Sequence, residues 1–369
     1  MPDDALHLKG AARGDAAGNA ALSGAIDTDV HPRAPYAHDL IPYLDEHWAD
    51  VARHRDVVMR DLTSYPPNAP LVRRPDWGEP GQAGGTLEGI RSDLLDRWGL
   101  RAAILTPLFG GAMMHDAFLG AALCAAHNDW IAGDWLDQEP RLRASIVVHP
   151  NRPEVAAQEI DRVAADRRFV QVILPVQTEI PLGRPVFRPL FEAAVRNRLP
   201  VALHAGSMFR NPPSQCGYFS TFSEDYVAQN AGFTAQLGNL ISEGVFAEMP
   251  DLKVVLVESG VTWLAPFMWR FSKDWRGVRN EVPWVNRNPC DIIRDHVRLT
   301  AQPFDAPAYA TEKLVSQLGS EAMLMFASDY PHWHYDGDAA VPAGFPDAAL
   351  PGLLHGNALA TYPRLEEAA

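Results

Sequence analysis

Acidic and imidazole side chains follow four short apolar runs of the sequence. Asp29 and His31 close the first run, and His204, Glu258 and Asp329 come just after three later ones. Two imidazole nitrogens with several carboxylate oxygens, and no thiolate, are ligands that divalent cations take in proteins. Without a cation, carboxylates brought this close would repel one another, and at least one would have to hold a proton. The pattern predicts a metal centre, provided that the fold brings these residues together.

The elements that must position these residues are repeated strand–helix units. Short apolar runs alternate with amphipathic segments, which is typical of βα repeats. The predicted strands are residues 25–30, 102–105, 144–148, 170–174, 201–203, 254–257, 297–300 and 323–326, and the clearest helices are 39–54, 115–136, 153–165, 189–198 and 226–243. Eight units predict an α/β fold, a (β/α)8 TIM-type barrel, with an insertion after the first strand whose Pro/Gly-rich part spans 66–85.

A closed barrel would gather the acids and imidazoles in one place. Catalytic residues of such barrels lie at the carboxyl ends of the strands. Asp29 and His31 are two positions apart, so strand periodicity puts both on one face. Taken singly, Asp29 could cap a turn, His31 and His204 could be core histidines with satisfied nitrogens, and Asp329 could form an Asx-turn. Their joint placement at strand ends favours the metal site.

Composition limits the domain organisation and the partners. The chain has 369 residues, of which 47% are hydrophobic and 21% charged, enough for a large core. We predict a mobile leader at 1–23 and a single domain at 24–369, because no linker or repeat divides the pattern. The formal net charge of −14 argues against nucleic acid. No signal peptide or apolar run of membrane-spanning length is found, which predicts a cytoplasmic protein without a membrane partner.

The cysteines do not suggest a disulfide framework. Cys124, Cys216 and Cys290 are widely separated, odd in number and without a CxxC pair. A nucleophilic thiol would need a neighbouring base, and none can be identified in the sequence. We therefore expect three buried, reduced thiols.

Several of these motifs together resemble the amidohydrolase 2 branch of the metal-dependent hydrolases. The similarity extends over about residues 25–362, and its motifs are Asp27-x-Asp29-x-His31, Leu203-His204-x-Gly206, Glu258-Ser-Gly260-x-x-Trp263, Ser328-Asp329-Tyr-Pro-His332, Asn128-Asp-Trp130, the loop 185–189 and His355-Gly-Asn357-Ala. The resemblance implies the barrel, a bound divalent metal and chemistry that ranges from hydrolysis to non-oxidative decarboxylation.

Two departures from the family pattern refine this expectation. Asp29 replaces the first His of the family's His-x-His, and this oxygen donor moves the preference toward Mn²⁺, Fe²⁺ or Mg²⁺ relative to Zn²⁺. Glu258 stands where many decarboxylating relatives carry a His, which argues against decarboxylation. No Lys follows the fourth strand to bridge two metals after carbamylation. We expect one divalent ion, Zn, Mn or Fe.

The resemblance suggests a role for each residue. Asp29, His31 and His204 would bind the ion, which activates a water and polarises a carbonyl. Asp329 would complete the metal shell or act as general base, the role that we favour. Glu258 would be a further ligand or would orient a histidine. His332, with His334, could contact the substrate.

The expected reaction is hydrolysis of an activated acyl bond by a metal-activated water. The Asp-for-His form resembles acyl-CoA thioesterases of bacterial natural-product pathways, which favours a thioester of a bulky apolar acid as the small-molecule substrate. Aromatic and Met residues of the expected mouth loops would suit such a group: Phe109, Met113, Met114, Met208, Phe209, Tyr218, Phe219 and Trp263. The alternatives are decarboxylation of an aromatic or enoic acid, and an inactive metal-binding scaffold. Family members commonly self-associate, so a homo-oligomer is a further possibility.

Overall fold

Eight parallel strands form the centre of the molecule. The computed structural model describes residues 22–55, 57, 85–206, 211, 216–332 and 335–367. Neighbouring strands pair in the order of the chain. They are β1 (Ile26–Val30), β2 (Ala102–Leu105), β3 (Leu142–Val147), β4 (Phe169–Pro175), β5 (Val201–His204), β6 (Val254–Val257), β7 (Val297–Thr300) and β8 (Leu324–Met325). Thr28 donates two hydrogen bonds to Phe326 O, and Val30 bridges to Tyr330, so β1 meets the β8 end and closes the predicted (β/α)8 barrel.

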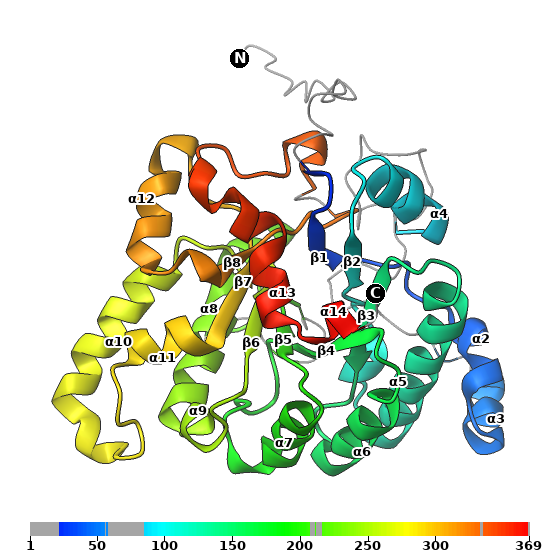
Figure 1. Ribbon diagram of the computed structural model, residues 1–369. Helices are drawn as coiled ribbons and strands as arrows, with labels where there is room; N and C mark the ends of the chain where they lie inside the picture. Colours follow the sequence, from blue (N-terminus) through cyan, green and yellow to red (C-terminus); the bar gives the residue numbers. More distant parts are fainter. Residues whose placement is uncertain are drawn as a thin grey trace, which may run out of the picture.

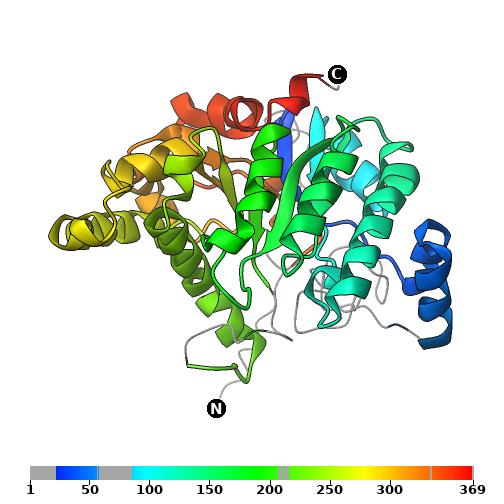
Figure 2. The ribbon, with the colours of Figure 1, turned by 90° about the horizontal axis from the view of Figure 1, so that it is seen from below.

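Helices surround this barrel (Figure 1). They are α2 (Ala37–Leu40), α3 (Glu46–Arg55), α4 (Leu87–Ile90), α5 (Ala117–Ile131), α6 (Pro153–Val163), α7 (Arg188–Arg196), α8 (Phe222–Ser242), α9 (Val245–Glu248), α10 (Leu264–Val278), α11 (Pro289–His296), α12 (Ala308–Leu318), α13 (Asn357–Thr361) and α14 (Arg364–Glu367). In α6 the buried residues Ala156, Ile160 and Val163 recur at helical spacing and form the face toward the barrel. Figure 2 shows α3 and α10 at opposite ends of the molecule.

Two predicted helices differ from the observed ones. The segment 39–54 is not one helix: a 3₁₀ turn at Ile41–Tyr43 contains Pro42, and the chain restarts as α3 after Asp45, whose carboxylate accepts a hydrogen bond from Trp48 N. Helix α8 begins at Phe222, before the predicted start at 226. Thr221 and Glu224 form a capping box there, a sequence signal that the periodicity alone did not reveal.

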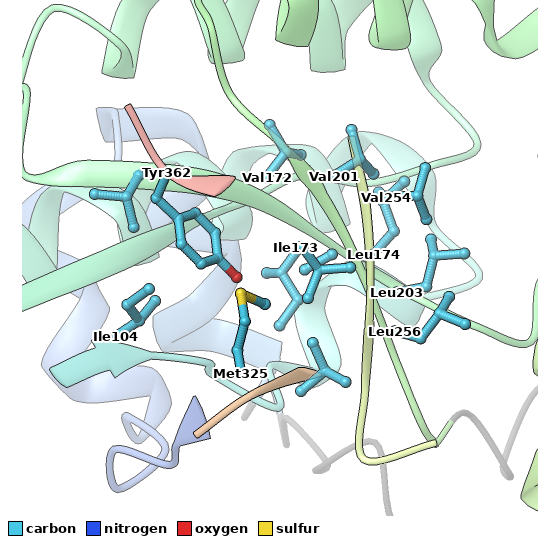
Figure 3. Close-up of a cluster of buried hydrophobic side chains, with 14 of the residues drawn as sticks. Ile104, Val172, Ile173, Leu174, Val201, Leu203, Val254, Leu256, Met325 and Tyr362 are labelled. Carbon is cyan, nitrogen blue, oxygen red and sulfur yellow. The ribbon is translucent and has the colours of Figure 1, made fainter. Parts of the chain in front are cut away.

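Branched aliphatic side chains fill the barrel. Figure 3 shows Val172 and Leu174 of β4 beside residues of β5 and β6, with Tyr362 entering the core from the end of the chain. The Tyr362 hydroxyl donates to Gln171 Oε1 at 3.0 Å. Arg364 is fully buried and donates to carbonyls that flank β4 and β5. The C-terminal segment therefore seals the amino-terminal end of the barrel, the end that contributes to stability in this fold.

The predicted leader and insertion lie largely outside the described residues. Within the predicted leader, Leu22 is buried in the core. The insertion is described again from Gly85. Its φ is +69°, and a Cβ atom there would lie 2.2 Å from His31 O. Only glycine allows the insertion to return this close to the end of β1.

The cysteine prediction is partly wrong. Cys124 and Cys290 are buried, but Cys216 is exposed, because it lies on the long connection after β5 instead of in the core. Among the described residues, no helix is both long and apolar enough to cross a membrane.

Candidate metal centre

Asp29 and His31 lie together at the end of β1, as the strand periodicity predicts. His31 Nε2 is 3.3 Å from Asp29 Oδ1, and both side chains are almost fully buried. Thr106, the residue after β2, holds both of them. Its hydroxyl donates a short hydrogen bond to Asp29 Oδ1, and its carbonyl oxygen is 2.9 Å from His31 Nδ1. Strand β2 thus fixes the orientation of both groups at the barrel mouth, the end formed by the carboxyl ends of the strands.

His204 reaches the same point from the end of β5. Its Nε2 is 3.9 Å from Asp29 Oδ1 and 3.6 Å from Glu258 Oε2. Its Nδ1 is 2.7 Å from Ala205 O. The rings of His31 and His204 stand edge to face with centroids 5.1 Å apart.

Both imidazoles are neutral and have a fixed tautomer. Burial lowers the pKa of His31 and of His204 to about 4, with neighbouring charges as smaller contributions. Because each Nδ1 faces a carbonyl oxygen, the proton of the neutral ring sits on Nδ1, and Nε2 keeps its lone pair. Neither Nε2 has a hydrogen-bond partner although both are buried. This is the state in which histidine binds a metal ion.

The acids Glu258 and Asp329 complete the mouth from β6 and β8. Asp329 Oδ1 is 3.0 Å from His31 Nε2. Both residues have positive φ, 59° and 55°, which is uncommon for a residue with a side chain. Such strain concentrates at functional sites. Here it turns the chain where each strand ends, with the carboxylate still facing the mouth.

The electrostatics of the mouth favour a cation. The pKa of Asp29 is raised well above its usual value, first by burial and then by repulsion from Asp329 and Glu258. Asp29 Oδ2 is buried without a hydrogen-bond partner. The Glu258 carboxylate lies beside Nε2 of His204, the ring nitrogen with the lone pair. The other ring nitrogen, Nδ1, faces Ala205 O. Glu258 therefore borders the space where a metal would sit and does not orient the far side of that ring.

His332 joins the site after Asp329. Its Nδ1 is 2.9 Å from Asp329 Oδ1, and its ring stacks on His31 with centroids 3.8 Å apart. Trp263 is half-buried, donates from its indole to Ser259 O, and packs on Phe267. The other two predicted substrate contacts, Phe209 and His334, lie outside the described residues.

Sequence reasoning assigned no role to two buried polar residues of the site, Thr106 and Asp27. Thr106 directly follows an apolar run, the same signal that identified the other residues. Asp27 accepts hydrogen bonds from the backbone of Asp29 and Ser328 and so ties β1 to the β8 end. Burial raises the pKa of Asp27 to about 7. In the sequence, Asp27 stood out only as the first residue of the Asp27-x-Asp29-x-His31 motif.

The donor atoms form two overlapping sets with a geometry that suits one divalent ion. Within each set the atoms lie within 4.8 Å of one another: Asp29, His31 and His204 in the first, and His31, Asp329 and His332 in the second. Neutral nitrogen lone pairs and carboxylate oxygens fit such an ion, and its charge would relieve the repulsion at Asp29. The residues present therefore fit a metal held by Asp29, His31, His204 and Asp329.

Comparisons with known proteins agree with this fold. A model of the family described as amidohydrolase matches residues 26–364. The γ-resorcylate decarboxylase of Polaromonas sp. strain JS666 is 24% identical over 316 residues, 79% of this chain and 88% of that protein. An amidohydrolase from Mycobacterium avium subsp. paratuberculosis superposes with a TM-score of 0.72 at 20% identity, covering 92% of this chain and 99% of that one.

A further similar structure was solved with a metal. It is the 5-carboxyvanillate decarboxylase of Novosphingobium aromaticivorans, complexed with manganese and 4-hydroxy-3-methoxy-5-nitrobenzoic acid. Its TM-score is 0.67 at 21% identity, with 93% of this chain and 97% of that chain covered.

Proposed function

The chain belongs to the amidohydrolase family, and on this premise we propose that it is a divalent-metal-dependent enzyme that removes carbon dioxide from a hydroxylated aromatic acid without oxidation. The observation that carries the proposal is the Asp329–His332 pair beside the neutral donors of His31 and His204. Similarity to decarboxylases of aromatic acids supports it. This choice reverses our sequence-based preference for hydrolysis, which relied on Asp29 and Glu258, each in place of a histidine.

Each residue of the metal centre would have its own role in this decarboxylation. A divalent ion, with Mn²⁺ as our choice, would supply positive charge that attracts the substrate's carboxylate and neighbouring hydroxyl oxygen. Asp329 would give a proton to the ring carbon that bears the carboxylate. As the C–C bond breaks, its electron pair returns to the ring, carbon dioxide leaves, and the proton takes its place on carbon. His332, in contact with Asp329, would restore the proton.

Glu258 keeps a second candidate open, the hydrolysis of an activated acyl bond such as a thioester. Its carboxylate lies 3.6 Å from His204 Nε2, at the edge of the same donor set. There it could take a proton from water that attacks an acyl carbonyl. A decarboxylase needs no base for water, so the effect of Glu258→Gln separates the two reactions.

The first experiment measures metal content by elemental mass spectrometry, with Asp29→Ala/His204→Ala as the comparison. We expect about one equivalent of divalent metal, lost in the double variant. The Mn²⁺-loaded protein is then assayed on dihydroxybenzoates and 5-carboxyvanillate for carbon dioxide release, and on acyl-CoA esters for free thiol. Carbon dioxide release that is lost in Asp329→Asn supports the proposal, whereas thiol release that is lost in Glu258→Gln supports the second candidate. Absence of metal in both proteins would refute the metal-dependent reactions, whereas a metal-containing protein whose Asp329→Asn variant behaves as wild type in every assay would support the scaffold hypothesis.

A further inference from the structure

A group of buried polar residues on the β4 and β5 side of the mouth has no role in the steps above. We call it the polar wall, and it consists of Gln177, Asn211, Asp225 and Gln229. Each has at most 8% of its surface exposed. Asn211 donates to Gln177 O at 3.3 Å. Because buried polar groups cost free energy unless they are paired, such a group needs an explanation.

Asp225 and Gln229 lie on one face of α8. Gly232 and Gln236 continue this face at helical spacing. A Cβ on Gly232 would lie 3.4 Å from Val176, and Gln236 donates to Val176 O at 2.7 Å, so the face packs on the end of β4. The same segment adjoins the metal centre, because Val176 N donates to the carbonyl of His204.

Asp225 is the unusual member of the polar wall. It is 3% exposed, and neither carboxylate oxygen has a hydrogen-bond partner. Burial raises its pKa to about 6; the nearby side chain of Gln229 opposes this rise, and repulsion from Glu258 adds to it, so the carboxyl group lies within electrostatic reach of the site. Helix capping does not account for it, because Thr221 and Glu224 form the capping box of α8. A buried carboxyl group that receives no hydrogen bond costs more free energy than the isosteric amide would. Proteins retain such a cost at sites where a ligand supplies the missing donor.

We propose that Asp225 binds a hydrogen-bond donor of the substrate, a hydroxyl or amino group other than the hydroxyl beside the reacting carboxylate. The inference rests on the proposed decarboxylation and narrows its substrates to aromatic acids with a second donor substituent. Asp225 acts as a specificity-determining residue: it accepts the hydrogen bond, and Gln229, one turn along the helix, lies beside it as part of the same wall. The reacting atoms stay with the metal centre and Asp329.

The test compares ligands that differ by one hydroxyl group. The Mn²⁺-loaded wild type, Asp225→Asn and Glu224→Gln are titrated by calorimetry with 2-nitrophenol and with nitrophenols that carry one further hydroxyl, 2-nitroresorcinol among them. Glu224→Gln is the matched control, because it removes one negative charge from the same turn at an exposed position. The matching hydroxybenzoates and dihydroxybenzoates are assayed for kcat and KM.

We expect at least one dihydroxy ligand to bind wild type about tenfold or more tightly than 2-nitrophenol, the size of a hydrogen bond to a charged group. Asp225→Asn should reduce this preference to about twofold and raise KM for the matching acid with little change in kcat, while Glu224→Gln keeps it. The melting temperature of Asp225→Asn should be unchanged or higher, which a purely structural aspartate would not allow.

The outcomes separate this inference from the proposed function. A preference that depends on Asp225, without decarboxylation of any acid, supports the donor-binding role and refutes the reaction. If the enzyme decarboxylates an acid but wild type and Asp225→Asn prefer the dihydroxy ligands equally, the role of Asp225 is refuted and the proposed reaction is not. The inference is also wrong if no dihydroxy ligand binds wild type better than 2-nitrophenol.

Discussion

Thr106 should control metal affinity although it is not a predicted ligand. Its hydroxyl donates to Asp29 Oδ1, and its backbone carbonyl faces His31 Nδ1. Thr106→Val removes the hydroxyl and keeps the carbonyl and the side-chain shape. A hydrogen bond to a charged acceptor contributes about 1.5–3 kcal/mol, and loss of such a supporting bond weakens metal binding about 10- to 100-fold. We expect a loss of this size for Mn²⁺.

The loss of Mn²⁺ affinity in Thr106→Val should depend on pH. Burial and the neighbouring acids raise the pKa of Asp29, so without metal Asp29 is protonated up to that raised pKa. At a pH below this pKa, metal binding must remove the proton from Asp29, and only the resulting carboxylate gains the full hydrogen bond from the Thr106 hydroxyl. Above it, the carboxylate already has this bond before metal binds. The loss in Thr106→Val should therefore be largest at low pH and shrink as pH rises.

The assay is competition between the protein and a chromogenic chelator for Mn²⁺, at a mildly acidic and a mildly basic pH. Thr106→Ser is the matched control, because it keeps the hydroxyl and loses only the methyl group. Equal affinities of Thr106→Val and Thr106→Ser at both pH values would refute the reasoning.

Three further predictions follow from the structure. Glu139 accepts hydrogen bonds from Arg141 and Arg91, which lower its pKa to about 2, so its contribution to stability is complete above the unfolded pKa near 4.5 and is lost as pH falls toward 2. Denaturant unfolding of Glu139→Gln should show a loss on the order of 2–3 kcal/mol at pH 7 that narrows at pH 3, and an equal loss at both would contradict this. Asn128 exchanges two hydrogen bonds with the backbone of Val147, so Asn128→Ala should lower stability by about 2–3 kcal/mol, checked against Asp129→Ala on the exposed face. Chelation should lower the melting temperature of wild type but not that of Asp29→Ala/His204→Ala.

The sequence predicted the barrel and the meeting of five residues at four strand ends because both follow from simple periodicities. Apolar runs of strand length set the number of strands, and the carboxyl ends of parallel strands must meet at one end of a barrel. Asp29, His31 and His204 therefore required no knowledge of long-range contacts. The strand bounds agree within a few residues, with the largest shortfall at β8, where residues 323–326 reduce to Leu324–Met325.

The sequence could not place residues whose position depends on how the chain turns after a strand. His332 is three residues past Asp329, where strand periodicity no longer applies. The left-handed backbone at Asp329 turns the chain back, and His332 stacks on His31 as a result. The helix predicted from periodicity began at residue 226, just after Asp225. The sequence pattern therefore could not show that Asp225 faces inward.

The apolar mouth, which we predicted from aromatic and Met content, is the least accurate of the sequence-based predictions. Phe109 is buried and packs on His127 of α5, whereas Tyr218 is largely exposed. Met208 and Phe209 lie outside the described residues. Composition identifies side chains suited to an apolar ligand, but the same side chains equally serve the contact between a helix and the barrel. Composition did not suggest the polar wall, which lies on the connections after β4 and β5 and on the start of α8.

The mouth combines several unfavourable features that a ligand would offset together. Glu258 and Asp329 occupy left-handed backbone, Asp29 is buried close to both, and Asp225 is buried without a donor. Each feature costs on the order of 1–3 kcal/mol in a molecule whose net stability is about 5–15 kcal/mol. A cation would relieve the repulsion among the three acids at the metal centre, but it would leave Asp225 without a donor. Two different partners are therefore needed, a metal ion for the acids around Asp29 and a hydrogen-bond donor for Asp225. An aromatic acid with a further hydroxyl group can provide that donor while its carboxylate lies at the metal, so the proposed substrate class is compatible with both partners.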